Sequence, residues 1–239
     1  MEATRIANYR TKQDLAYLTI KDSILSCHLA PGERLVIRDL AARLNVSETP
    51  VRVALTRLAA EGLVESVSHV GAVVGQIRGD EIEDVHILIG SLAGLAAQRV
   101  AARHSPADAE RIRAALAKLD ALPEEASYED YAVLNHRFHR TIYTLARSTL
   151  LASLLEQLFD RLHAAHLIWS LPTHRQLARV EHAAIVRAID LGLPSEARAA
   201  EEKHWQRAGR DFQSQVMKGI VAWPLGPAGE ATAGTDSGR

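Results

Sequence analysis

The chain has 239 residues, of which 47% are hydrophobic and 5% aromatic, and its formal net charge at pH 7 is −1. This length suits one large domain or two small ones, and the apolar fraction is sufficient for a packed core. No run of 18 apolar residues is present, which excludes a transmembrane helix, and the first 14 residues lack the apolar core of a signal peptide.

Cys27 is the only cysteine, which excludes an internal disulfide and fits a reducing compartment, so we expect a cytoplasmic protein with no membrane partner. Ala and Leu outnumber aromatic residues, and this bias favours helices over a β-rich fold. The charge is uneven, with a net of +2 over residues 1–78 and −3 over residues 79–239. This asymmetry is too mild to identify a DNA-binding protein by itself.

The first part of the chain predicts three helices and then two strands. Apolar spacing and breakers predict the helices at residues 14–27, 37–44 and 48–61. Asn45 and Val46 form the corner between the last two, Ser47 is placed to cap the third, and Gly62 ends it. Residues 63–77 are rich in Val and predict a hairpin with its turn at His69–Gly71. We therefore assign residues 1–78 to a winged helix-turn-helix domain.

The rest of the chain has helical periodicity. Proline residues lie in or beside the breaks, and the pattern predicts six helices at about 80–103, 106–120, 127–147, 149–169, 174–191 and 194–217. The predicted fold is mainly α, an N-terminal winged helix-turn-helix followed by a C-terminal all-helical bundle over residues 79–221. Residues 222–239, rich in Gly, Pro, Ala and Thr, predict a disordered tail.

In a helix-turn-helix the second helix enters the major groove and its N-terminal residues approach the bases. The residues predicted to lie nearest DNA are Ser47, Glu48, Thr49 and Arg52. Arg52 has the geometry to contact a guanine edge or a phosphate. Arg38 is placed for a phosphate, Arg57 for the flank, and His69 for the minor groove or a phosphate at the wing tip. Taken singly, each of these residues could equally be an ordinary solvent-exposed side chain, such as a solvated charge on a helix surface.

The stretch PGERLVIRDLAARLNVSETPVRVALTRLAAEGLVE resembles the winged helix-turn-helix of the GntR family. The shared features are the Pro-Gly-Glu turn at residues 31–33, the Leu-Ala pair at 40–41 in the second helix, the Val-Ser-x-Thr-Pro-Val-Arg corner at 46–52 and the Glu-Gly-Leu sequence at 61–63, where the third helix ends. Two positions depart from the family pattern, Glu48 where Arg is usual and Val53 where Glu is usual. In proteins that it resembles the Arg touches DNA, whereas Glu48 repels phosphate and could accept a hydrogen bond from cytosine N4. A different operator or weaker binding is expected.

Four side chains of the helical half are candidates for a metal site. Asn135 and His139 are four residues apart and share a helix face, while His182 and His204 lie on two later helices. Imidazoles and a side-chain oxygen from three helices could bind one divalent cation. With eleven histidines in the chain, this spacing alone is weak evidence.

The pattern Asn135-His136-Arg137-Phe138-His139, Glu181-His182 and His204 resembles the FCD effector-binding domain of the FadR subfamily of GntR regulators, in its shorter, six-helix, VanR-like version. The resemblance implies that Asn135, His139, His182 and His204 hold zinc or nickel. Asn in place of the more common Asp removes one negative charge from the site.

The resemblance also implies an effector cavity, but one of its usual anchors is missing. Relatives commonly carry Arg and Glu where this chain has Ile89 and Ala93, so a carboxylate effector would lose one contact. The metal itself, Arg175 or Arg179 could replace that contact, although both arginines also fit a surface position. Tyr143, four residues after His139, fits either the cavity or the core.

These observations predict a transcriptional regulator, repressor or activator, that binds double-stranded operator DNA as a homodimer and senses a small-molecule effector, most simply a carboxylate. A regulator for which the metal itself is the signal is the closest alternative. A metal-dependent hydrolase is a further one, although the sequence contains no HExxH motif. A purely architectural DNA-binding protein would not need a second domain of this size.

Overall fold

The computed structural model describes residues 11–26, 28–77, 81–166 and 172–217, and these residues form two compact units. One unit comprises the described residues up to Ile77 and the other those from Glu81 onward. No helix in these ranges is long and apolar enough to cross a membrane. The predicted disordered tail at residues 222–239 lies outside the described residues.

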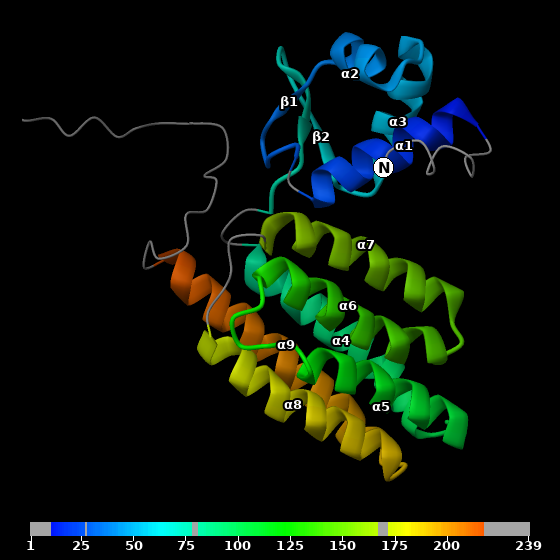
Figure 1. Ribbon diagram of the computed structural model, residues 1–239, viewed down its shortest axis with the longest axis vertical. Coiled ribbons are helices and arrows are strands. Elements are labelled where there is room, and N and C mark those ends of the chain that lie inside the picture. Colours follow the sequence, from blue (N-terminus) through cyan, green and yellow to red (C-terminus); the bar gives the residue numbers. More distant parts are fainter. Residues whose placement is uncertain (1–10, 27, 78–80, 167–171, 218–239) are drawn as a thin grey trace, which may run out of the picture. The chain divides into compact units, whose positions relative to one another are not determined.

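The first unit contains three helices and a small antiparallel sheet (Figure 1). The helices are α1 (Lys12–Leu25), α2 (Ile37–Leu44) and α3 (Glu48–Ala60), and the strands are β1 (Arg34–Leu35), β2 (Val64–Val67) and β3 (Gly71–Val74). The sheet order is β1-β3-β2, and Val67 pairs with Gly71 next to the turn. The predicted winged helix-turn-helix is confirmed. Strand β1 was not predicted, because two residues are too short to show an alternating pattern.

The corner before α3 differs from the prediction in one respect. Asn45 adopts the left-handed conformation, with φ 52°, and its N–H donates to the carbonyls of Ala41 and Ala42. Ser47 occupies the N-cap position, but its exposed side chain makes no capping hydrogen bond, so the predicted cap is wrong. The N-terminus of α3 therefore has no side-chain cap, and Ser47, Glu48 and Thr49 are exposed there.

The core of the first unit lies between α1 and α3. Buried apolar side chains face each other across this interface, including Ala16, Ile20 and Ile24 from α1 and Val51, Ala54 and Leu58 from α3. Gly62 ends α3 as predicted, with φ 74°, and the N–H of Leu63 donates to the carbonyl of Leu58 at 2.9 Å. This packing presents the opposite, polar face of α3 to solvent.

The second unit is an all-helical bundle, as predicted. Its helices are α4 (Ile82–Ala101), α5 (Pro106–Asp120), α6 (Tyr128–Leu145), α7 (Thr149–His166), α8 (Pro172–Asp190) and α9 (Pro194–Met217). The described ends agree with the predicted ones to within three residues. Helix α4 is central and packs against α6, α7, α8 and α9 (Figure 1).

Helices α4 and α9 approach closely because glycines lie between them. A Cβ atom at Gly90 would come within 3.0 Å of Trp205 Cβ, and one at Gly94 within 3.1 Å of the Arg198 carbonyl oxygen. On the other helix, a Cβ atom at Gly209 would come within 2.7 Å of His86 Cβ. This close pairing makes α9 an inner helix, and it places side chains of α9 in the middle of the bundle.

Candidate metal centre and DNA interface

Three histidines from three different helices meet in the core of the second unit. They are His139 on α6, His182 on α8 and His204 on α9, and the exposed fraction of each is 2% or less. One ligand atom from each lies within 4.8 Å of the others. The ring centroids are separated by 5.1 Å, 5.2 Å and 4.7 Å for the three pairs. The predicted convergence of these histidines is thus present in the fold.

Aromatic side chains surround this histidine cluster. The ring of Phe138 lies 4.8 Å from that of His182, and the indole of Trp205 lies 4.8 Å from the ring of His139. Phe159 of α7 stacks on His139 at 6.1 Å and meets Trp205 edge-on at 5.2 Å. These apolar walls exclude water and strengthen electrostatic interactions inside the cluster.

Two carboxylates determine which ring nitrogen faces the centre. The Nδ1 atom of His139 is 3.3 Å from Glu201 Oε1, and that of His204 is 2.7 Å from Glu181 Oε2. Carboxylates only accept hydrogen bonds, so in both rings Nδ1 carries the proton. In the neutral ring the lone pair is then on Nε2, which is the atom that a metal ion would bind.

Both carboxylates have further partners. Glu201, which is 1% exposed, also accepts a hydrogen bond from Trp205 Nε1 at 3.0 Å. Glu181 accepts two hydrogen bonds from the guanidinium of Arg207, at 2.6 Å from Nε and 2.7 Å from Nη2. These charge-assisted contacts fix the carboxylates, and through them the orientation of the imidazoles.

The donor set fits a divalent cation. In the described part of the chain, Asn135 Oδ1 and His139 Nε2 are buried without a hydrogen-bond partner, and each atom carries a lone pair. A buried polar atom without a partner costs free energy unless something binds it. Asn135 precedes His139 by one helical turn, so the unpaired oxygen and nitrogen share a face of α6. Three imidazoles and one amide oxygen form a set that suits zinc or nickel.

Sequence reasoning missed Glu201 and Trp205. Glu201 and His204 are three residues apart, and Glu-x-x-His on a helix is a recognised pattern of metal sites in helical bundles. That spacing was a usable signal. No such signal exists for Trp205, because its contact with Glu201 depends on both side chains turning inward on α9.

The expected effector residues of α4 and α6 are buried, and their contact with an effector stays a prediction. Ile89 is fully buried. Tyr143 is 1% exposed, and its hydroxyl lies 3.1 Å from His136 Nε2 at the interface of α6 and α7, so it belongs to the core. The same network includes Glu156, whose pKa is lowered to about 2, first by the hydrogen bond from His136. His136 stacks on Phe159 at 4.8 Å and lies outside the histidine cluster.

The two arginines of α8 also have other partners. The guanidinium of Arg175 donates to the carbonyls of Glu124 and Ala126, and that of Arg179 to those of Asp120 and Leu122. The prediction that they replace a missing anchor beside the metal is therefore not supported. Both side chains instead reach toward the segment that links α5 to α6.

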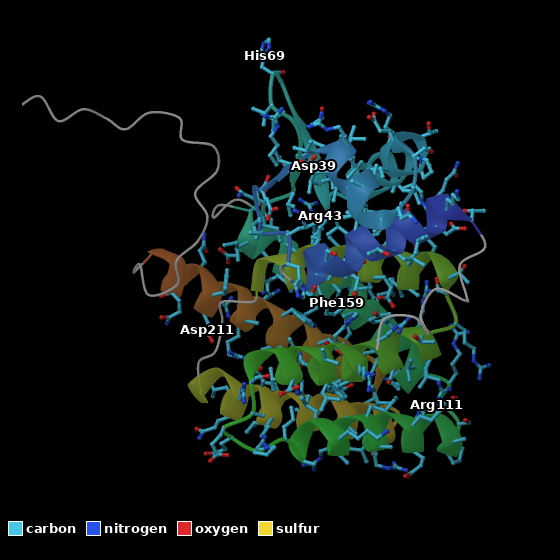
Figure 2. The ribbon with its side chains drawn as sticks, turned by 45° about the horizontal axis from the view of Figure 1, so that its top comes forward. Asp39, Arg43, His69, Arg111, Phe159 and Asp211 are labelled. Atoms are coloured by element: carbon cyan, nitrogen blue, oxygen red, sulfur yellow. The ribbon has the colours of Figure 1, made fainter. Side chains whose placement is uncertain are left out.

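The expected DNA-contacting residues of α2 and α3 are exposed. They are Arg38, Ser47, Glu48, Thr49 and Arg52. Glu48 and Arg52 form an ion pair on the first two turns of α3, with 2.8 Å between Oε2 and Nη2. His69 has φ 64° and lies at the tip of the β2–β3 hairpin (Figure 2). These positions are compatible with a DNA interface that includes α3 and the wing.

Arg57 has an intradomain role that the sequence did not indicate. Its guanidinium carbon lies 3.9 Å from the centroid of the Tyr17 ring, and Nη1 lies 3.2 Å from Asp14 Oδ1. Both partners belong to α1, which packs on the side of α3 that carries Arg57. These contacts turn Arg57 toward α1, so the prediction of a DNA contact is not supported.

Comparison with known proteins agrees with this architecture. Residues 12–74 match the model described as "Bacterial regulatory proteins, gntR family", and residues 85–207 match the FCD domain. A probable D-xylose utilization operon transcriptional repressor of Paenarthrobacter nicotinovorans is 30% identical over 166 residues, covering 70% of this chain and 73% of that protein. An uncharacterized HTH-type transcriptional regulator in an unstable DNA locus of Streptomyces ambofaciens is 31% identical, and the match covers 58% of each chain.

The fold also matches a solved structure. The Escherichia coli protein described as McbR/YncC superposes with a TM-score of 0.73 over 87% of this chain and 100% of that chain. Sequence identity in this match is 19%, so the match concerns the fold.

Proposed function

Because the chain belongs to the GntR family of bacterial regulatory proteins and carries an FCD domain, we propose that a small carboxylate effector controls its affinity for operator DNA. The effector binds at or near a divalent metal, zinc or nickel, in the C-terminal unit. The family is one of transcriptional regulators, and this membership sets aside the hydrolase alternative.

The observation that carries the proposal is the histidine cluster with its two carboxylates. The ion would be held by Asn135, His139, His182 and His204. Among the described residues, Asn135 Oδ1 and His139 Nε2 are buried without a hydrogen-bond partner, so binding an ion would satisfy both atoms. When bound, the ion supplies a positive charge that attracts an anion in an otherwise apolar core. Glu201 and Glu181 orient the imidazoles toward that centre.

A regulator for which the ion itself is the signal remains the second candidate. The observation that favours it is the depth of the site, because the exposed fractions of the three histidines are 2% or less. Binding of the ion would join α6, α8 and α9, since one ligand comes from each. Metal binding would then change the rigidity of the bundle without an organic effector.

We propose that the chain acts as a repressor, the activity in the description of the Paenarthrobacter relative. It binds as a homodimer, because one recognition helix reads only a few base pairs and a symmetric dimer supplies the second half-site. Contacts to DNA come from Ser47, Glu48, Thr49 and Arg52 of α3, with Arg38 and His69 at the edges.

The decisive experiment measures operator affinity by fluorescence anisotropy, using the DNA upstream of the chain's own gene and a shuffled control. Four samples are compared: metal-stripped protein, metal-loaded protein, and each of these with a panel of small carboxylates. An effect of a carboxylate that requires the metal supports the carboxylate sensor. A change with metal alone supports the metal-responsive alternative, and an affinity that none of them alters overturns both.

A further inference from the structure

A small pocket lies beside the segment that links α5 to α6, and residues of α5, α6 and α8 line it. Its cavity volume is about 40 Å³, and its apolar lining includes Leu119, Leu122, Pro123 and Tyr131. Arg175, Gln176 and Arg179 of α8 line the same pocket, together with Glu124. The pocket thus combines an apolar body with two guanidinium groups and one carboxylate, a net positive lining that suits an organic anion.

Arg175 lacks a carboxylate partner. Its guanidinium donates to the carbonyls of Glu124 at 3.2 Å and Ala126 at 2.8 Å, and its central carbon lies 5.0 Å from the centroid of the Tyr131 ring. Within the ranges that the structure describes, no Asp or Glu forms an ion pair with it. In these contacts its positive charge faces main-chain dipoles and an aromatic ring.

Arg179 holds the same segment from its other end. It donates to the carbonyls of Asp120 at 3.0 Å and Leu122 at 3.2 Å, and its Nε lies 3.8 Å from the Asp120 carboxylate. The two arginines together engage four carbonyls between residues 120 and 126. We name these contacts the arginine latch.

We propose that this pocket binds an organic carboxylate with an apolar body, which takes Arg175 away from the carbonyls of Glu124 and Ala126. The carbonyls are neutral acceptors, whereas a carboxylate carries a full negative charge and can accept two parallel N–H bonds from the guanidinium, so an entering anion competes for the side chain. The Tyr131 hydroxyl is neutral at neutral pH and does not repel an anion, and burial raises its pKa further, to about 12.

Binding must open the arginine latch. A volume of about 40 Å³ holds little more than a water molecule or two, so an organic anion fits only when residues 121–127 move outward. The site is separate from the metal centre. It nevertheless shares two helices with it, because Tyr131 precedes Asn135 by one turn of α6 and Arg179 precedes His182 by three residues of α8. A second ligand could thus act on the same helices without touching the metal.

The test uses the full chain and calorimetric titration with benzoate, and with benzamide as the neutral molecule of the same shape. Each is titrated into metal-loaded and metal-stripped protein. We expect benzoate to bind both forms and benzamide to bind neither. Arg175→Met should weaken benzoate binding about tenfold or more. Arg187→Met, which removes an exposed arginine of the same helix, should leave it unchanged.

Hydrogen exchange in the unmodified protein provides a test that does not depend on a variant. Benzoate should increase exchange of amides in residues 121–127, among them that of Ala126, which donates to the Pro123 carbonyl. Absence of benzoate binding, equal binding to Arg175→Met, or unchanged exchange would overturn the proposal. Binding that occurs only with metal would also overturn it, while leaving the carboxylate sensor of the proposed function intact.

Discussion

His139 and Glu201 are 62 residues apart in the chain, yet their Nδ1 and Oε1 atoms lie 3.3 Å apart and both side chains are 1% exposed. A buried carboxylate is costly unless hydrogen bonds satisfy it, and Glu201 accepts from both His139 and Trp205. The imidazole in turn receives a fixed orientation. This relationship makes Glu201 a positioning residue for the metal site.

Replacing Glu201 with Gln tests this role. The amide keeps the size but accepts the His139 hydrogen bond less strongly, and loss of such a partner typically lowers metal affinity about 10- to 100-fold. The measurement is a competition titration with a zinc chelator of known affinity. Glu202→Gln is the matched control, because Glu202 pairs with Arg198 and not with a histidine. Equal zinc affinity in all three proteins would show that Glu201 does not position the site.

Replacing His139 with Ala should lower both metal content and melting temperature, since metal-binding energy is also folding energy. Metal content is measured by elemental analysis, and stability by thermal unfolding with and without added zinc. His136→Ala is the control, because His136 contacts Tyr143 and Phe159 on the α7 side of α6. That control should keep its metal, even if the loss of packing lowers its melting temperature. A wild-type protein that contains no metal and whose melting point zinc and nickel leave unchanged would refute the site.

The pair of Glu48 and Arg52 is expected to control DNA binding. Arg52→Ala should cost specific binding about 1–3 kcal/mol if the guanidinium contacts a guanine edge. Glu48→Arg should strengthen non-specific binding and steepen its salt dependence, because it replaces a repelled carboxylate with a phosphate partner. Both effects are read from affinities measured over a range of salt concentrations. A salt dependence that Glu48→Arg does not change would place residue 48 away from the DNA.

His86 should make the second unit less stable in acid. Burial lowers its pKa from 6.5 to about 4, while its Nδ1 donates to the Ile82 carbonyl at 2.7 Å. Above pH 6.5 the ring is neutral in both states, and its contribution to stability is fully present. Between about pH 6.5 and 4 the unfolded chain binds a proton that the folded chain does not, so stability falls with falling pH, by about 3 kcal/mol in all.

Urea unfolding of the wild type and of His86→Leu between pH 4 and 8 measures this effect. The variant should lose less stability on acidification, because leucine does not bind a proton. Parallel stability curves for the two proteins would show that His86 does not contribute to the acid dependence.

The protein should be a homodimer in solution, formed mainly through the C-terminal unit, since a symmetric pair is needed to contact two half-sites. Light scattering at micromolar concentration measures the mass directly. A mass near the 26.1 kDa of one chain would contradict the prediction.

Helical periodicity and breakers were sufficient to predict the helices of both units. Gly62 and Gly192 adopt the positive φ that a helix end requires, and Asn45 forms the corner that its place between two amphipathic segments indicated. Such local features depend on neighbouring residues only. The one strand that was missed, Arg34–Leu35, is held by pairing with Val73 and Ala72, almost 40 residues later.

In the candidate metal site too, some features follow from the local sequence and others only from contacts between distant segments. The spacing of Asn135 and His139 placed them on one helix face, His182 and His204 followed as candidates on two later helices, and resemblance to a known domain supported all four. Sequence did not reveal that Glu201 and Glu181 orient the rings, nor that Arg175 and Arg179 reach the carbonyls of residues 120–126. A helix face follows from a period of 3.6 residues, but the partner across an interface depends on how separate helices pack. The glycines between α4 and α9 carry no side chain, so the two helices pack closely and α9 lies inside the bundle. Glu201 reaches His139 only through this tertiary packing.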